Sequence, residues 1–217
     1  MENIGKFEEI FKRYEGNPIL TPESWPYKVA SVFNPGAIKF NDEFLLLVRV
    51  EDMQGYSHLT IAKSKNGKTN WQIDSKPTLA AEPELGEDKI GLEDPRIIWL
   101  EERQEYIITC VSFFKGVTGE PPGISLIATK DFSNFERLGR QLIPPNKDAS
   151  LFPRKIRGYY ALINRPIVEG RADIWVSFSK DLNFWGKDRT LILAGHKTWD
   201  SSRIGLGPPP IETPEGW

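Results

Sequence analysis

The stretch AIKFNDEFLLLVR, residues 37–49, decides the fold, because it has the pattern of one complete β-hairpin. An apolar strand at 37–40 meets a polar turn at 41–43, and a second apolar strand opens with Phe44. Apolar and aromatic runs separated by Asn and Asp are typical of antiparallel strands joined by a turn. The stretch therefore predicts a sheet and supplies a pattern to search for elsewhere.

The same hairpin pattern recurs at residues 97–109 and 151–165. A second hairpin follows each copy, with first strands that open at residues 59, 125 and 174. Four short strands repeated every ~50 to 65 residues are typical of a β-propeller blade. We therefore predict an all-β protein with one domain over 1–217, of about three blades plus the start of a fourth. The chain stops where the fourth module should continue, which predicts missing C-terminal blades; a β-sandwich is the alternative fold.

Composition narrows the class of protein. Of the 217 residues, 27% are charged and 39% hydrophobic, as in ordinary soluble globular proteins. A net charge of −2 gives no electrostatic case for binding nucleic acid or an acidic membrane surface. No apolar run approaches the ~20 residues that span a bilayer, and the N-terminus lacks a signal-peptide pattern. We expect a cytoplasmic protein, with its single cysteine, Cys110, buried in a strand.

The motif GLEDPR, residues 91–96, packs two carboxylates and a guanidinium around a proline. Pro95 fixes its own φ and is expected to hold Asp94 extended. Neighbouring side chains of an extended chain point to opposite sides. Glu93 and Asp94 should then face different ways, one carboxyl aimed into a site and the other holding the loop. This arrangement predicts a single catalytic acid.

The repeats predict where the polar motifs meet. Three loops, 34–36, 93–96 and 147–150, sit just before the first strand of a module. In a propeller that strand lines the central channel, so these loops should converge at one mouth. Arg49 and Arg165 close second strands at the same end, and Arg203 begins a fourth such entrance.

One acid among cations suggests a particular chemistry. Arginine binds phosphate or carboxylate with two donors, and Lys147 would add a point charge. An inverting glycosidase needs a second carboxyl to activate water, whereas phosphate is already an anionic nucleophile. Surface charges or strand-end salt bridges are the alternative interpretation of the same residues. No metal is implied, because no histidine or cysteine cluster accompanies the carboxylates.

Several motifs together resemble glycoside hydrolase family 130. They are NPGA at 34–37, GLEDPR at 91–96, KD at 147–148, LFP at 151–153, NRP at 164–166 and the run 199–210. The resemblance extends from about Asn17 to Trp217. Characterised members are mostly inverting β-mannoside phosphorylases on a five-bladed propeller. Residues 32–36, 49–52 and 73–77 look most like the β-1,2-mannobiose and β-1,2-oligomannan phosphorylases, and members continue beyond the equivalent of Trp217.

The resemblance implies phosphorolysis of a β-1,2- or β-1,4-linked manno-oligosaccharide to α-mannose 1-phosphate. It implies no cofactor, with inorganic phosphate as the co-substrate. Asp94 matches the catalytic acid, whose proton would reach the glycosidic oxygen through the mannose 3-hydroxyl. The cations Lys147, Arg165 and Arg203 match phosphate ligands, Arg203 standing where lysine is common. The residues Asn34, Arg49 and Asp148 match the mannose subsite.

Two other functions stay open at this point. A β-mannosidase on the same fold would show a second channel carboxylate and would lack phosphate ligands. A non-catalytic propeller fragment, acting in sugar binding or assembly, would expose strand edges and could form homo-oligomers.

Overall fold

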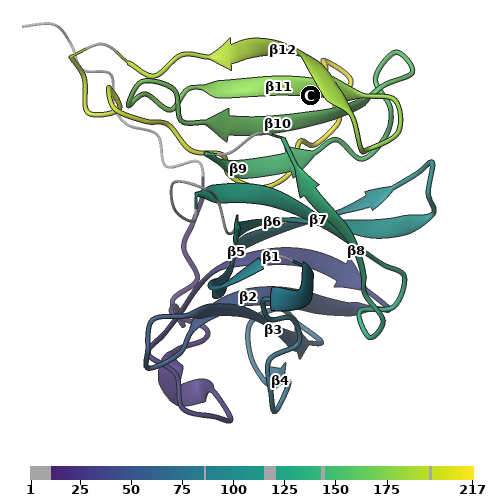
Figure 1. Cartoon of the computed structure of the whole chain (residues 1–217). Helices are drawn as coiled ribbons and strands as arrows, with labels where there is room; N and C mark the ends of the chain where they lie inside the picture. Colours follow the sequence, from purple (N-terminus) through teal and green to yellow (C-terminus); the bar gives the residue numbers. More distant parts are fainter. Residues whose placement is uncertain (1–10, 86, 115–120, 143–144, 196) are drawn as a thin grey trace, which may run out of the picture.

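The computed structural model describes residues 11–85, 87–114, 121–142, 145–195 and 197–217. Within these ranges the chain is all-β, with two short 3-10 helices, η1 (Pro22–Ser24) and η2 (Pro83–Leu85) (Figure 1). The strands are β1 (Ser31–Phe40), β2 (Glu43–Glu51), β3 (Ser57–Ser64), β4 (Gln72–Ile73), β5 (Glu87–Leu100), β6 (Glu105–Phe114), β7 (Pro122–Thr129), β8 (Glu136–Gln141), β9 (Asn146–Leu151), β10 (Tyr160–Pro166), β11 (Ile174–Ser179) and β12 (Trp185–Ile192).

Consecutive strands pair antiparallel in three groups of four, which we call module 1 (β1–β4), module 2 (β5–β8) and module 3 (β9–β12). The modules follow one another through the molecule in Figure 1. This arrangement confirms the predicted all-β class and the recurring pair of hairpins. Modules 1 and 2 also touch through one parallel pair, Ser57 with Gly91. Gly91 is required there, because its φ is +105° and a Cβ would lie 1.7 Å from the Ser57 carbonyl oxygen.

Two of the hydrophobic core clusters lie between the modules. Alternate residues of the central sheet point to opposite faces, so Ile97 packs toward module 1 and Ile98 toward module 3. The first cluster includes Leu45, Leu47, Ile61, Ile108 and Ile127, and the second includes Leu100, Ile107, Leu126, Leu151 and Leu162. Each such side chain stabilises the fold by about 1.5–3 kcal/mol on burial. Cys110 is buried in the first cluster, as predicted.

The first strands of the modules carry the polar motifs. Strand β5 packs beside both β1 and β9, so the three lie next to one another. The prediction that the motifs precede these strands was wrong. Strand pairing starts before each motif and resumes after it, as at Glu93 with Val111 and Arg96 with Thr109. Each motif is therefore a β-bulge, in which two residues of the first strand oppose one residue of the second.

The bulge has the same form in every module. The paired residues of the first strands flank Asn34 and Pro35 in β1, Asp94 and Pro95 in β5, and Asp148 and Ala149 in β9. Opposite each pair lies one residue of the second strand. This repeat places three polar side chains at equivalent points of adjacent strands.

The turn after each third strand repeats as well. In module 2, Thr129 Oγ1 accepts a hydrogen bond from the Phe132 backbone N–H (3.0 Å). Asp131 Oδ1 accepts from the backbone N–H groups of Ser133 and Asn134 (2.8 Å each). The equivalent pairs are Ser64 with Asn66 in module 1 and Ser179 with Asp181 in module 3. We call these the modular turns.

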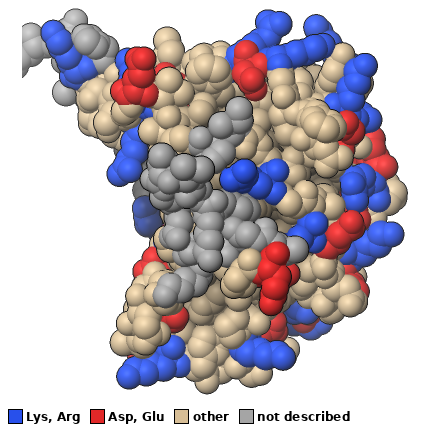
Figure 2. Space-filling model, viewed as in Figure 1, with Lys and Arg blue, Asp and Glu red and all other residues tan. Residues whose placement is uncertain are grey.

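The surface carries both signs of charge. On the face shown in Figure 2, Lys and Arg are interspersed with Asp and Glu around the rim. Among the residues that the structure describes, no helix has the length and apolar character needed to cross a membrane.

Candidate active site

The three bulges bend the backbone into the left-handed region. Asn34 has φ 44°, Asp94 has φ 50° and Asp148 has φ 48°. Asn and Asp tolerate this region better than most residues, yet such a conformation costs about 1–3 kcal/mol. The prediction that Pro95 holds Asp94 extended was wrong, because the two-against-one pairing of the bulge sets the backbone of Asp94.

A pocket of about 1000 Å³ opens beside the bulges. The predicted site residues Asn34, Asp94, Lys147, Asp148, Arg165 and Arg203 all line it. The seventh predicted site residue, Arg49, does not line the pocket itself. Its Nη1 donates to Oδ1 of Asp94, which does (3.1 Å). The structure thus brings together every residue that the sequence proposed for the site.

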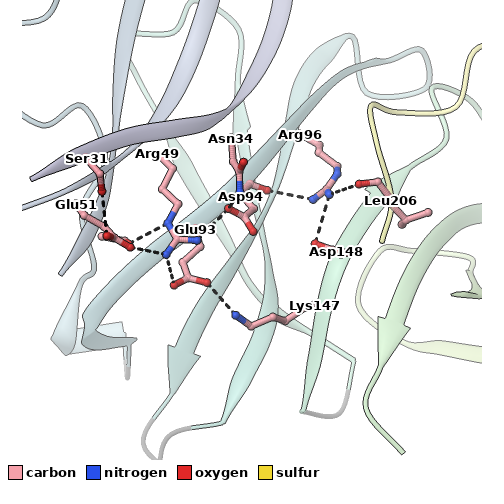
Figure 3. Close-up of polar contacts among 11 residues, drawn as sticks. Ser31, Asn34, Arg49, Glu51, Glu93, Asp94, Arg96, Lys147, Asp148 and Leu206 are labelled. Atoms are coloured by element: carbon pink, nitrogen blue, oxygen red, sulfur yellow. Dashed lines mark hydrogen bonds and ion pairs between the residues drawn. The ribbon is translucent and has the colours of Figure 1, made fainter. Parts of the chain in front are cut away.

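Only one of the two carboxylate oxygens of Asp94 accepts hydrogen bonds from the described residues. Its Oδ1 accepts hydrogen bonds from Asn34 Nδ2 (3.0 Å) and Arg49 Nη1 (3.1 Å) (Figure 3). Its Oδ2 has no hydrogen-bond partner within the described ranges, and the side chain is 18% exposed. The carboxyl is therefore fixed in orientation while one oxygen faces the pocket.

Glu93 is buried and joins two cations. Its Oε1 accepts from Arg49 Nη2 (2.8 Å) and its Oε2 from Lys147 Nζ (3.0 Å). Both carboxylates contact Arg49, but of the two only Asp94 lines the pocket. This placement agrees with the prediction that one carboxyl is aimed into the site while the other holds the loop.

Asp148 is engaged by two guanidinium groups. Arg165 Nη1 lies 2.7 Å from Asp148 Oδ2, and Arg96 Nη2 lies 3.4 Å from Asp148 Oδ1. Both oxygens are thus occupied in the structure. Arg203, by contrast, is exposed and forms no ion pair in the part of the chain that the structure describes. It is the cation most available to an anion in the pocket.

Arg96 was missed by the sequence reasoning. It is the last residue of the motif GLEDPR, whose pattern predicts a role only for the acid. Its guanidinium donates to the carbonyl oxygens of Leu206 (2.8 Å) and Gly207 (2.8 Å), which lie 110 and 111 residues away in the sequence. The arginine in the motif was the available signal, but nothing in the sequence indicated those partners.

The pocket offers one carboxyl oxygen without a partner and several cations. Within the described ranges, no group of three His, Cys, Asp or Glu side chains is arranged to hold a metal ion. Of the neighbouring carboxylates, Glu93 and Asp148 are each bound by two basic groups, and Glu51 accepts from Arg49 Nη2 (2.8 Å) and Ser31 Oγ (3.0 Å). Such a site can donate a proton to one end of a ligand and bind an anion near it.

Comparisons with known proteins agree with this arrangement. The family model described as beta-1,4-mannooligosaccharide phosphorylase matches residues 5–217. A 1,2-beta-oligomannan phosphorylase of Thermoanaerobacter sp. is 36% identical over 214 residues, which cover 95% of this chain and 69% of the relative. A beta-1,4-mannooligosaccharide phosphorylase of Ruminococcus albus is 30% identical, with 97% of this chain and 63% of the relative covered. The chain thus spans about two thirds of these relatives.

A solved structure shows the same fold. The beta-1,2-mannobiose phosphorylase of Listeria innocua, in complex with beta-1,2-mannobiose, superimposes with a TM-score of 0.80 at 29% identity. The match covers 94% of this chain and 72% of the Listeria chain. The motifs, the family model and these relatives together show that the chain belongs to glycoside hydrolase family 130.

Proposed function

We propose that the protein cleaves β-mannosides with inorganic phosphate, inverting the anomeric centre to give α-mannose 1-phosphate. The observation that carries this proposal is the pocket itself, where a single carboxyl with a free oxygen lies together with Lys147, Arg165 and Arg203. The relatives named as phosphorylases of β-linked mannosides support it.

In the proposed reaction, Asp94 is the acid. A phosphate oxygen attacks the anomeric carbon of the mannosyl unit from the face opposite the leaving sugar. The bond between that carbon and the glycosidic oxygen breaks, and the proton of Asp94 ends on that oxygen, directly or through a sugar hydroxyl. Asn34 and Arg49 orient the acid through Oδ1, so the proton is carried by Oδ2, which faces the pocket.

The cations bind and orient the phosphate. Arg203 is open to the pocket, and Lys147 is partly exposed beside it, with 28% of its side chain accessible. Holding phosphate in line with the anomeric carbon makes the attack effectively unimolecular. Asn34, Arg49 and Asp148 then form the mannose side of the site.

Phosphorolysis explains the pocket better than hydrolysis does. An inverting hydrolase needs a second carboxylate to take a proton from water. Three other carboxylates lie around Asp94. Glu93 and Asp148 each contact two basic groups, and Glu51, which does not line the pocket, accepts from Arg49 Nη2 (2.8 Å) and Ser31 Oγ (3.0 Å). None of the three is therefore poised as a base in the pocket, whereas phosphate needs none.

The fold and the linkage belong to the same proposal. We infer that the three modules are blades of a five-bladed propeller of which this chain carries the first part, with β1, β5 and β9 lining the channel. Their side-by-side packing and the Listeria superposition support this. A β-1,2 linkage is favoured, since the Thermoanaerobacter relative is 36% identical and the Ruminococcus β-1,4 enzyme is 30% identical.

The test is a phosphorolysis assay on purified protein. β-1,2-Mannobiose and β-1,4-mannobiose are each incubated with and without phosphate, and mannose 1-phosphate and free mannose are measured. The proposal expects mannose 1-phosphate, in the α form by NMR, only when phosphate is present. Mannose release that does not depend on phosphate would instead establish a hydrolase.

A further inference from the structure

Arg96 forms hydrogen bonds with several separate segments around the pocket. Its guanidinium donates to the backbone oxygen of Asp94 (3.2 Å), to Asp148 Oδ1 (3.4 Å) and to the Leu206 carbonyl (2.8 Å) (Figure 3). It also donates to the Gly207 carbonyl (2.8 Å). These contacts use all but one of the N–H donors of an arginine. The side chain is 12% exposed, so the bonds are largely shielded from water.

The partners of Arg96 connect the acid with a phosphate-binding cation. Asp94 is the proposed acid, and Asp148 is paired with Arg165, a proposed phosphate ligand. Residues 204–207, which we call the strap, follow Arg203 directly. Figure 3 shows Arg96 between Asp94, Asp148 and Leu206.

The strap lies against the Asp148–Arg165 pair. A Cβ at Gly205 would sit 3.2 Å from Asp148 Oδ2 and 3.5 Å from Arg165 Nη1, so the glycine permits this close approach. Arg165 Nη1 also donates to the carbonyl of Ile204 (3.1 Å). The strap has no strand or helix of its own, and guanidinium groups hold its carbonyls in place.

We propose that Arg96 is a positioning residue that sets the distance between the acid and the phosphate-binding cations by holding the acid's bulge, Asp148 and the strap to one rigid group. The inference rests on the function proposed above. A guanidinium is planar and donates in several fixed directions, whereas the ammonium of lysine is a compact point charge. Lysine at this position would keep the charge but could not reproduce this set of contacts.

The test is Arg96→Lys, compared with the unchanged protein in steady-state phosphorolysis and in amide hydrogen exchange. We expect kcat/KM to fall about 10²-fold, the size of effect that a displacement of about 1 Å produces in a catalytic site. The fall should appear in kcat as well as in the KM for phosphate, because both sides of the site shift. Exchange of the Ile204 amide, which is the strap amide that donates a hydrogen bond (to the Ala172 carbonyl, 3.2 Å), should become faster while exchange in β6 and β7 stays unchanged.

Arg137→Lys is the matched control. Arg137 also fastens a loop through its guanidinium, donating to the Ala80 carbonyl and to Glu82 (3.1 Å), and it does not line the pocket. This control should keep kcat and KM within about twofold of the unchanged protein. If Arg96→Lys fails to fold, Arg96→Gln, which keeps one nitrogen with two N–H donors, takes its place in both measurements.

Unchanged strap exchange in the Arg96 variant would overturn the proposal whatever the activity. Equal kinetic losses in the Arg96 and Arg137 variants would overturn it too, since the effect would then follow general stability. If the unchanged protein converts no mannoside, the proposed function fails. The exchange data alone then decide whether Arg96 holds the strap, and faster exchange would support that part.

Discussion

The bulges and the modular turns each recur in all three modules, but they differ in which of their contacts are repeated. Each modular turn pairs a Ser or Thr hydroxyl with an Asn or Asp side chain, and in each the hydroxyl accepts from the backbone N–H three residues further on. The bulges keep one backbone shape, but their side chains make different contacts at one pocket: Asn34 donates to Asp94, Asp94 also accepts from Arg49, and Asp148 pairs with Arg96 and Arg165. The repeat that serves stability keeps its contacts, whereas the repeat at the site has changed them.

The largest expected effect comes from Asp94→Asn in the central bulge. Asn can accept the same contacts from Asn34 and Arg49 but cannot supply the proton, so kcat should fall about 10²–10⁴-fold. Phosphorolysis kinetics measure the loss, and urea unfolding should show stability close to that of the unchanged protein. Full activity in this variant would remove Asp94 from the role of acid and would place the bulges with the turns as structural repeats.

A smaller effect is expected from Arg203→Met. Arg203 pairs with no carboxylate among the described residues, so the substitution leaves no carboxylate without its ion-pair partner. A hydrogen bond to a charged group contributes about 1.5–3 kcal/mol, which predicts a rise of about 10- to 100-fold in the KM for phosphate. The KM for the mannoside should change little.

Arg189→Met on β12 is the matched control, because Arg189 is also exposed and does not line the pocket. An equal rise in both variants would mean that overall charge sets phosphate affinity.

The sequence was sufficient for the hairpins and insufficient for the bulges. Alternating apolar residues and turn residues are local signals, so the strands around 44–49 and 106–109 could be predicted. A bulge depends on how many residues lie opposite in another strand, as at Asp94 and Pro95 against Cys110, and this count has no local signal. The clustering of the site residues followed from the repeat, whereas the contacts of Arg96 with Leu206 depend on tertiary packing.

The modular turns should govern stability without affecting catalysis. Thr129→Val keeps the shape of the side chain but removes the hydroxyl that accepts from Phe132 and donates to the Asn134 carbonyl (2.7 Å). Thr129 is 4% exposed, so the groups left unpaired should cost about 1–3 kcal/mol in the free energy of unfolding.

Urea unfolding measures this cost, and kcat and KM should stay within about twofold of the unchanged protein. Thr213→Val removes an exposed hydroxyl that donates to the Gly216 carbonyl (2.9 Å), and it should cost much less. A change in kcat or KM in the Thr129 variant would show that the modular turns affect catalysis as well as stability.

The smallest effect concerns acid stability at Asp131. Hydrogen bonds from the backbone and side chain of Asn134, and then from the Ser133 backbone, lower the pKa of Asp131 from 3.8 to about 2. Because the pKa is lower in the folded state, the ionised carboxylate stabilises the fold above pH 3.8. That contribution is lost as the pH falls from 3.8 towards 2. Asp131→Asn lacks the titrating group, so the difference in urea midpoint between the two proteins should be largest at neutral pH and shrink at pH ~2.5. A difference that stays constant with pH would show that the turn depends on the shape of residue 131 and not on its charge.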